Sequence, residues 1–248
     1  MQRALIGFFL CVFATLAFAQ AQKAPAPAYE PQVGQEGKDV VWVPTPQSVV
    51  DKMLDMAKVT AKDYVIDLGS GDGRTVITAA KRGARAHGIE YNPDMVALAK
   101  RAAEKEGVAS RATFEKADLF ESDFSKATVI TMFLLPEINL RLRPKILELK
   151  PSTRIVSNTF TMGDWKADQT FGGGEDCEGS WCTALLWIVP AKVAGTYKTG
   201  HGELTLKQQF QMLSGTLRTG GKTLALEGKV NGEEVSFKAG GREYRGRM

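Results

Sequence analysis

The sequence predicts an α/β layer fold followed by a small all-β module. Apolar strand patterns alternate with helical patterns between residues 40 and 190, which is the signature of helices covering a sheet. A glycine-rich turn at residues 69–73 directly follows the first of these strands. After residue 190 the helical periodicity stops and short β-prone runs follow one another.

The elements of the α/β part follow in order along the chain. We expect helices at 46–58, 74–81, from 93 onward and at 137–149, and strands at 64–68, 85–90, 112–116, 128–133, 154–159 and 181–189. The helical segments repeat apolar residues every three to four positions, whereas the strands are short apolar runs. Pro93 suits the first turn of its helix, and Pro151 follows the fourth helix. The run at 181–189 is expected to pair as a hairpin with residues near Phe171.

The C-terminal part has a different character. Its β-prone runs are 193–198, 203–206, 209–217, 223–229 and 234–238. Asn231-Gly232 lies between two alternating runs and is a strong hairpin signal. These runs predict a β-meander or barrel-like module at 191–248.

The first 19 residues have the features of a signal peptide. Arg3 precedes an apolar stretch of about 15 residues, shorter than the roughly 20 that span a bilayer as a helix. Ala17-Phe18-Ala19 then provides a small-x-small cleavage pattern. We therefore expect cleavage after Ala19, a disordered linker at 20–39, and a periplasmic or secreted protein without a transmembrane span. An uncleaved membrane anchor is the alternative.

Cysteine usage is compatible with export. Cleavage of the signal peptide removes Cys11 and leaves Cys177 and Cys182 in the segment C-E-G-S-W-C. These two cysteines are expected to form a disulfide in an oxidising compartment, with two free thiols as the alternative. Candidate ligands that would make the pair a zinc site are not found nearby.

Charge and histidine content exclude two classes of function. The formal net charge is +4, and no block of five or more Lys or Arg occurs, so a nucleic-acid-binding stripe is not indicated. His87 and His201 are too few and too far apart for a histidine-rich metal centre.

The glycine turn predicts a cofactor site. Gly69, Gly71 and Gly73 alternate after a strand that ends in Asp67-Leu68, and glycine lets a ligand approach the backbone closely. The dinucleotide fingerprint would require a third glycine at position 74, which is Arg74. The acidic residues Asp67 and Asp72 would repel a pyrophosphate but suit a cation, which favours S-adenosylmethionine (SAM) over NAD.

Two further acidic residues end neighbouring strands. Glu90 follows Gly69 by 21 residues, where a carboxylate accepts hydrogen bonds from both ribose hydroxyls. Asp118 follows the third strand and suits the adenine amino group. The alternative is that Asp72 caps a helix, Glu90 is a solvated strand end and Asp118 begins a turn.

Three motifs give the chain a family resemblance. V-I-D-L-G-S-G-D-G-R, G-I-E-Y-N-P and K-A-D-L-F resemble motif I, post-motif I and motif II of class I SAM-dependent methyltransferases, and the likeness covers residues 42–190. With V-W-V-P-T-P before the first helix, the chain is similar to the small lysine methyltransferases of mitochondria and bacteria. The resemblance implies a Rossmann-like seven-stranded sheet, a cofactor loop that includes Ser70, and methyl transfer to a protein side chain. It also implies that Trp42, Pro44 and Thr45 cover the cofactor, although Trp42 could equally be a core anchor.

The acceptor is expected near residues 131–137. This segment lacks the Asn/Asp-Pro-Pro-Tyr pattern used for adenine or glutamine amines, and its apolar residues Phe133, Leu134 and Pro136 could hold a desolvated amine or simply belong to the core. Glu137 is the nearest candidate base, or a helix-capping residue. Asn158 follows the fifth strand without a defined role, and Trp165 is expected to be structural.

The sequence thus predicts an exported SAM-dependent methyltransferase, with a protein lysine as the expected acceptor and no nucleic-acid partner. A small-molecule O- or N-methyltransferase and a non-catalytic SAM-binding protein are the alternatives.

Overall fold

The computed structural model describes residues 29–173 and 179–248, and Pro31–Met248 form one compact unit. The predicted signal peptide, the first part of the predicted linker and Cys177 lie outside the described residues. No helix within the described ranges is both long and apolar enough to cross a membrane.

The α/β part contains four helices and seven strands among the described residues. The helices are α1 (Gln47–Met56), α2 (Arg74–Lys81), α3 (Pro93–Lys105) and α4 (Pro136–Ile146). The strands are β1 (Tyr64–Leu68), β2 (Arg85–Glu90), β3 (Ala112–Lys116), β4 (Val129–Met132), β5 (Arg154–Asn158), β6 (Gln169–Gly172) and β7 (Thr183–Ile188). The predicted element order is confirmed.

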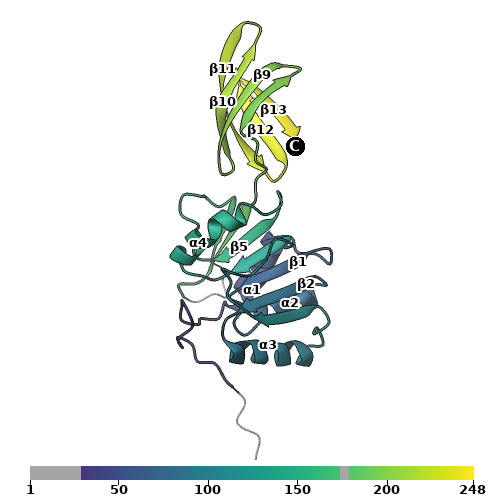
Figure 1. Cartoon of the computed structure of the whole chain (residues 1–248), viewed down its shortest axis with the longest axis vertical. Coiled ribbons are helices and arrows are strands. Elements are labelled where there is room, and N and C mark those ends of the chain that lie inside the picture. The colour runs from purple at the N-terminus through teal and green to yellow at the C-terminus, as the bar shows by residue number, and fades with distance from the viewer. Residues whose placement is uncertain (1–28, 174–178) are drawn as a thin grey trace, which may run out of the picture. The chain divides into compact units, whose positions relative to one another are not determined.

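These strands form one seven-stranded sheet in the order β3-β2-β1-β4-β5-β7-β6 (Figure 1). Strands β1 to β5 pair in parallel, whereas β7 is antiparallel to both β5 and β6. The predicted hairpin is confirmed, because Phe171 pairs with Ala184. The chain builds outward from β1 to β3 and then returns to β4 on the other side of β1. This reversal creates a crevice at the carboxyl ends of β1 and β4, where ligands bind in open α/β sheets.

Both faces of the sheet are covered. Val65 belongs to a core cluster with side chains of α1, α2 and α3, whereas its neighbour Ile66 belongs to a second cluster that includes Leu142 of α4. Strands buried on both faces appear in the sequence as continuous apolar runs, as β1 does. Asp67 is the polar exception in β1, and its position next to the crevice explains why.

The ends of α3 and α4 follow from capping and proline chemistry. Asn92 caps α3, since its side chain accepts hydrogen bonds from the amides of Asp94 and Met95. Helix α4 contains Pro144 and ends at Ile146, three residues before the predicted end. A proline removes a backbone donor inside a helix and weakens its last turns.

The C-terminal residues form a separate antiparallel sheet. Its strands are β8 (Gly195–Thr199), β9 (Gly202–Gln209), β10 (Met212–Thr219), β11 (Lys222–Asn231), β12 (Glu234–Ala239) and β13 (Arg242–Arg247), in the order β13-β12-β11-β10-β9-β8. Leu204, Leu213, Leu226 and Val230 belong to its own core cluster.

Three predictions for this region need correction. The run 209–217 is not one strand, because β9 ends at Gln209 and a turn with Phe210 at a φ of 51° precedes β10. Strand β13 was not predicted, since its charged residues conceal the β pattern. The Asn231-Gly232 hairpin is present but lies one residue later, because Asn231 pairs with Glu234 and closes a turn of Gly232 and Glu233.

Candidate functional site

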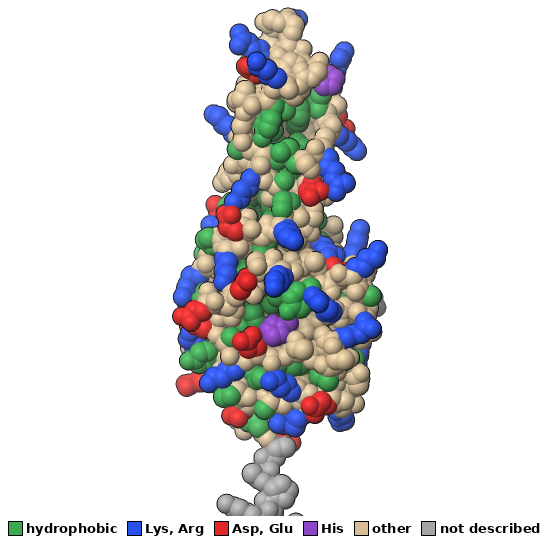
Figure 2. Space-filling view, turned by 45° about the vertical axis from the view of Figure 1, so that its right-hand side comes forward, with side chains coloured by type: hydrophobic (Ala, Val, Ile, Leu, Met, Phe, Trp, Pro, Cys, Tyr) green, Lys and Arg blue, Asp and Glu red, His purple; other side chains and the backbone are tan. Residues whose placement is uncertain are grey.

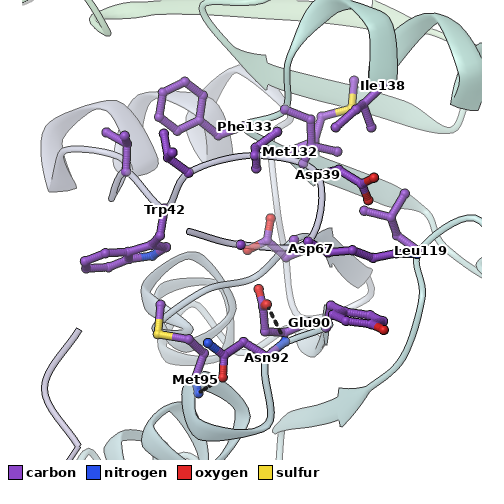
Figure 3. Close-up of a pocket in the computed structure, with 18 of the residues that line it drawn as sticks. Asp39, Trp42, Asp67, Glu90, Asn92, Met95, Leu119, Met132, Phe133 and Ile138 are labelled. Carbon is purple, nitrogen blue, oxygen red and sulfur yellow. Dashed lines mark hydrogen bonds between the residues drawn. The ribbon is translucent and has the colours of Figure 1, made fainter. Parts of the chain in front are cut away.

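A cavity of about 220 Å³ lies at the crevice of the large sheet. Its lining includes Asp67 of β1, Glu90 at the end of β2 and Asp118 just after β3, together with Gly69 of the glycine turn. Figure 3 shows Asp67 between Phe133 on one side and Glu90 on the other, with Trp42 at the flank. The fold therefore gathers the three acidic residues that the sequence predicted to act together.

Asp67 is almost fully buried. Only 6% of its surface is exposed, and its Oδ1 accepts a hydrogen bond of 2.6 Å from the hydroxyl of Thr131. Desolvation raises the pKa of Asp67 to about 7, and the nearby carboxylates of Asp72 and Glu90 act in the same direction. Asp67 forms no ion pair with any residue in the described ranges, so a cation in the cavity would stabilise its charged form.

Glu90 is held in position by backbone donors. The amide of Gly71 donates to its Oε2 and the amide of Asn92 to its Oε1, each at 2.9 Å. A carboxylate offers about four lone-pair sites. These two bonds orient Glu90 and leave acceptor capacity for both hydroxyls of a ribose.

Asp118 has a partner that the sequence did not indicate. Its Oδ1 accepts a 2.9 Å bond from the amide of Phe120, and its Oδ2 forms an ion pair with Lys38. The hydrogen bond from Lys38, followed by that from the Phe120 amide, lowers the pKa of Asp118 below its usual value. An adenine amino group that binds Asp118 would therefore displace Lys38 or share the Asp118 carboxylate with it.

Lys38 belongs to a hairpin at residues 34–42 that lines the cavity. The amide of Gly34 donates to the carbonyl of Trp42 at 2.8 Å, and that of Trp42 donates to the carbonyl of Gln35 at 2.9 Å. The sequence predicted a disordered linker up to residue 39. The structure differs for the last of these residues, because backbone pairing and the Lys38–Asp118 ion pair hold them against the site.

The glycine turn has the backbone that the sequence predicted. Gly69, Gly71 and Gly73 have φ angles of 75°, 53° and 82°. A Cβ on Gly73 would lie 2.7 Å from both the Ala99 methyl and the Phe114 ring. Ser70 does not line the cavity, because its hydroxyl is buried beneath β2.

Asp72 is not the bare acidic group that the sequence suggested. Arg74 binds it with two nitrogens, Nε at 3.0 Å and Nη2 at 2.6 Å from Oδ2. Arg74 also donates from Nη1 to the carbonyl of Thr45 at 3.0 Å. The residue at the position of the missing third glycine therefore neutralises Asp72 and fixes the segment leading into α1.

The side of the cavity next to residues 133–138, where the sequence predicted the acceptor, is apolar. Phe133 and Leu134 line it, as predicted, whereas Pro136 and Glu137 do not. Glu137 is exposed in the first turn of α4, and Ile138 lines the cavity instead. The structure does not bring Glu137 into the site, because α4 begins at Pro136 and turns that side chain toward solvent.

Two aromatic residues of this side were missed. Phe160 follows β5 and Trp181 precedes β7, and both line the cavity beside Phe133. Ring centroids are 5.8 Å apart for Phe133 with each partner and 5.4 Å apart for Phe160 and Trp181. No sequence spacing connects these three positions, because only the strand order brings them together.

The structure also locates the other residues that the sequence singled out. Trp42, Pro44 and Thr45 line the cavity, and Nδ2 of the fully buried Asn158 lies 3.5 Å from the Thr45 hydroxyl. Trp165 is fully buried and accepts a hydrogen bond at its carbonyl from Trp187, which confirms a structural role.

Cys182 is disulfide-bonded. Its predicted partner Cys177 lies outside the described residues, so that pairing stays a prediction.

The three acidic residues of the cavity fit SAM, a ligand with a cationic sulfur, a ribose and an adenine. Buried Asp67 has no counter-ion among the residues that the structure describes, Glu90 keeps free acceptor sites beside the glycine turn, and Asp118 lies at the third strand end. SAM supplies, when bound, a methyl group that its positive sulfur activates for transfer. Fold and site together define a SAM-dependent methyltransferase.

Comparison with known proteins identifies the family. Residues 67–169 match the ANTKMT methyltransferase domain. A protein-lysine N-methyltransferase of Saccharolobus islandicus is 50% identical over 129 residues, which are 51% of this chain and 80% of the relative. An ATP synthase lysine N-methyltransferase of Xenopus laevis is 35% identical over 136 residues, which are 54% of this chain and 60% of the relative. The chain belongs to this methyltransferase family.

A solved structure agrees with this assignment. The RNA methyltransferase of Salinibacter ruber, crystallised with S-adenosyl-L-homocysteine, is 48% identical with a TM-score of 0.57, and the match covers 61% of this chain and 96% of that one. The chain therefore spans nearly all of this protein and most of the archaeal relative but about three-fifths of the frog enzyme. The C-terminal sheet lies beyond the matched family domain.

Proposed function

We propose that this methyltransferase transfers the methyl group to the side-chain amine of a protein lysine. The observation that carries the proposal is the charge of the cavity. Its lining includes six carboxylates and two cations; these are Glu36, Asp39, Asp67, Asp72, Glu90, Asp118, Lys38 and Arg74. Both cations are in ion pairs, with Asp118 and Asp72.

An acidic cavity selects among acceptors. Glu36 and Asp39, which neither bind the cofactor nor neutralise a cation of the lining, attract the ammonium group of lysine, and the net negative charge repels the phosphates of a nucleic acid, which proteins bind with unpaired Lys and Arg. The relatives named as lysine methyltransferases support the same acceptor. The solved relative named for RNA makes a nucleic acid the acceptor against which this proposal is tested.

The aromatic residues of the cavity then favour the neutral form of the lysine amine. A lysine with its reference pKa of about 10.4 needs on the order of 4–5 kcal/mol to become neutral at pH 7. Phe133, Phe160 and Trp181 carry no hydrogen-bond acceptor in their side chains, so desolvation of the amine beside them lowers its pKa. The neutral nitrogen is the form that attacks a methyl carbon, and positioning it in line supplies most of the catalysis.

The acceptor test uses methyl-tritiated SAM with a lysine-rich protein, total RNA and a cell extract as separate substrates. We expect label in protein that protease removes and RNase does not, and mass spectrometry should place it on lysine. The Glu90→Ala variant is the inactive control, since it removes the predicted ribose contact. Label confined to RNA or to small molecules would overturn the proposal.

We also propose that the enzyme acts outside the cytoplasm. The sequence pattern of residues 1–19 and a disulfide at Cys182 support this location, because disulfides persist in oxidising compartments. Expression of the full chain in a Gram-negative host should yield a periplasmic protein that begins at Gln20. A protein that retains Met1 in the cytoplasm would contradict the proposal.

A further inference from the structure

The C-terminal sheet holds a second cavity that methyl transfer does not use. Its volume is about 670 Å³, within the range of roughly 300–1,000 Å³ typical of small-molecule sites. Its lining includes Tyr197, Leu204, Leu206, Leu217, Val235 and Phe237. Figure 2 shows hydrophobic side chains gathered over this sheet, with Lys and Arg side chains beside them.

Two glycines of the sheet lie so close to a neighbouring strand that a side chain would not fit. A Cβ on Gly215 of β10 would lie 1.9 Å from the carbonyl oxygen of Thr205, and one on Gly228 of β11 would lie 2.2 Å from that of Ser236. Glycine inside a strand marks close backbone approach or a tight bend of this kind. The close packing of these strands therefore requires glycine at these two positions.

The cavity opens along the two edge strands. The inner strands contribute alternate residues, such as Val235 and Phe237 of β12, because only one face of each strand looks inward. Strand β13 instead contributes the consecutive run Arg242–Arg247, and β8 contributes Tyr197–Thr199. These strands are the two ends of the sheet order, so the opening lies between unpaired edges.

The opening is basic. Lys198, Arg242, Arg245 and Arg247 line the cavity, and residues 191–248 carry ten Lys and Arg against five Glu. Arg245 and Arg247 pair with Glu243 and Glu233. Lys198 and Arg242 take part in none of the ion pairs found among residues 29–173 and 179–248, so both can meet an anion.

We propose that the C-terminal sheet binds a fatty carboxylate, an amphiphile with one acyl chain and an anionic head. The acyl chain fills the apolar interior, and the carboxylate pairs with Lys198 and Arg242 at the opening. A peptide strand is the weaker fit, because the charged side chains of β13 are of the kind that protects sheet edges from strand addition.

Calorimetry on the full chain tests this with three probes of equal chain length below their micellar concentrations: dodecanoate, dodecyl maltoside and dodecyltrimethylammonium. We expect one dodecanoate per chain, a weaker maltoside complex and a much weaker ammonium complex. Absence of saturable dodecanoate binding, or equal affinity for all three head groups, would overturn the proposal.

Variants locate the site. Lys198→Gln with Arg242→Gln should weaken dodecanoate about three- to tenfold and leave dodecyl maltoside unchanged, as expected for exposed charge pairs. Val235→Phe should weaken both probes by filling the cavity. Arg218→Gln is the matched control, because Arg218 is exposed on the same sheet outside the cavity lining.

Each variant must retain its circular dichroism and its SAM affinity, which shows that it is folded. Dodecanoate binding that Val235→Phe leaves unchanged, or that Arg218→Gln weakens as much as the double variant, would place the ligand elsewhere and overturn the site.

Discussion

The two sheets of this chain build their cavities by different means. In the large sheet the cavity lies at the carboxyl ends of parallel strands, and its central acidic residues lie in the last part of β1, at the end of β2 and just after β3. In the C-terminal sheet the cavity is enclosed by the faces and edges of antiparallel strands. Parallel topology thus gathers functional groups at the strand ends along one edge of the sheet, whereas the meander brings them together on the inward faces of its strands and on its two edge strands, β8 and β13.

The difference extends to charge. Carboxylates outnumber cations among the charged residues that line the first cavity, whereas cations outnumber carboxylates among those that line the second. One chain therefore offers a site for cationic ligands and a site for an anionic one. Each prediction below separates the two regions or tests a contact within one of them.

Removal of Glu90 should have the largest effect. Hydrogen bonds to charged groups contribute about 1.5–3 kcal/mol each, so Glu90→Ala should weaken SAM binding at least about tenfold and up to several hundredfold. Calorimetry with SAM measures this. Glu104→Ala is the control, because Glu104 is exposed on α3 away from the cavity. Equal affinity in the Glu90 variant would remove the ribose contact from the site.

Alanine at two close-packed glycines should separate the regions. Gly73→Ala forces a side chain to a positive φ that costs on the order of 1–3 kcal/mol, besides the contact with Phe114, and should weaken SAM binding about fivefold to a hundredfold. Gly215→Ala should distort the C-terminal sheet and leave SAM affinity within about twofold of the parent, since binding energies at distant sites add independently. Thermal unfolding and SAM calorimetry measure both. Loss of SAM binding in the Gly215 variant would show that the two sheets fold and bind together.

Asp67 should link SAM binding to protons. Its pKa is about 7 in the fold against 3.8 ordinarily, so its proton stabilises the ligand-free fold, and that stabilisation is lost as the pH rises through about 7. A bound cation favours the carboxylate, so SAM should bind more tightly as the pH rises from about 6 to about 8 and should release a proton near pH ~6.5.

Calorimetry in buffers of different protonation enthalpy measures the number of protons that SAM binding releases. Asp67→Asn should remove this release, because the amide oxygen still accepts the Thr131 hydrogen bond but does not titrate. Proton release that persists in the variant would assign the titration to another group.

The ion pair of Lys38 with Asp118 should have the smallest effect. Such a solvent-exposed pair contributes little, so Lys38→Ala should raise SAM affinity by less than about fivefold if adenine competes for Asp118. Lys62→Ala, at an exposed position outside the cavity, is the control. A loss of affinity of about tenfold would instead show that the hairpin at 34–42 holds the cofactor through Lys38.

The sequence by itself determined the element order, the cofactor end of the site and the acidic residues Asp67, Glu90 and Asp118. Strand ends and glycine turns are local features, and the parallel topology that they imply places them at one edge. The sequence also indicated the β-rich C-terminal region, but it did not predict strand β13, which is rich in charged residues, or the turn at Phe210.

Only the tertiary structure decided which groups meet across the chain. The pairing of Lys38 with Asp118 and the contact of Phe133 with Phe160 and Trp181 join residues from separate elements. The exclusion of Glu137 depends on how α4 is oriented, and the second cavity depends on which residues of several strands face one another. These contacts follow from packing in three dimensions, for which neither periodicity nor spacing in the sequence carries a signal.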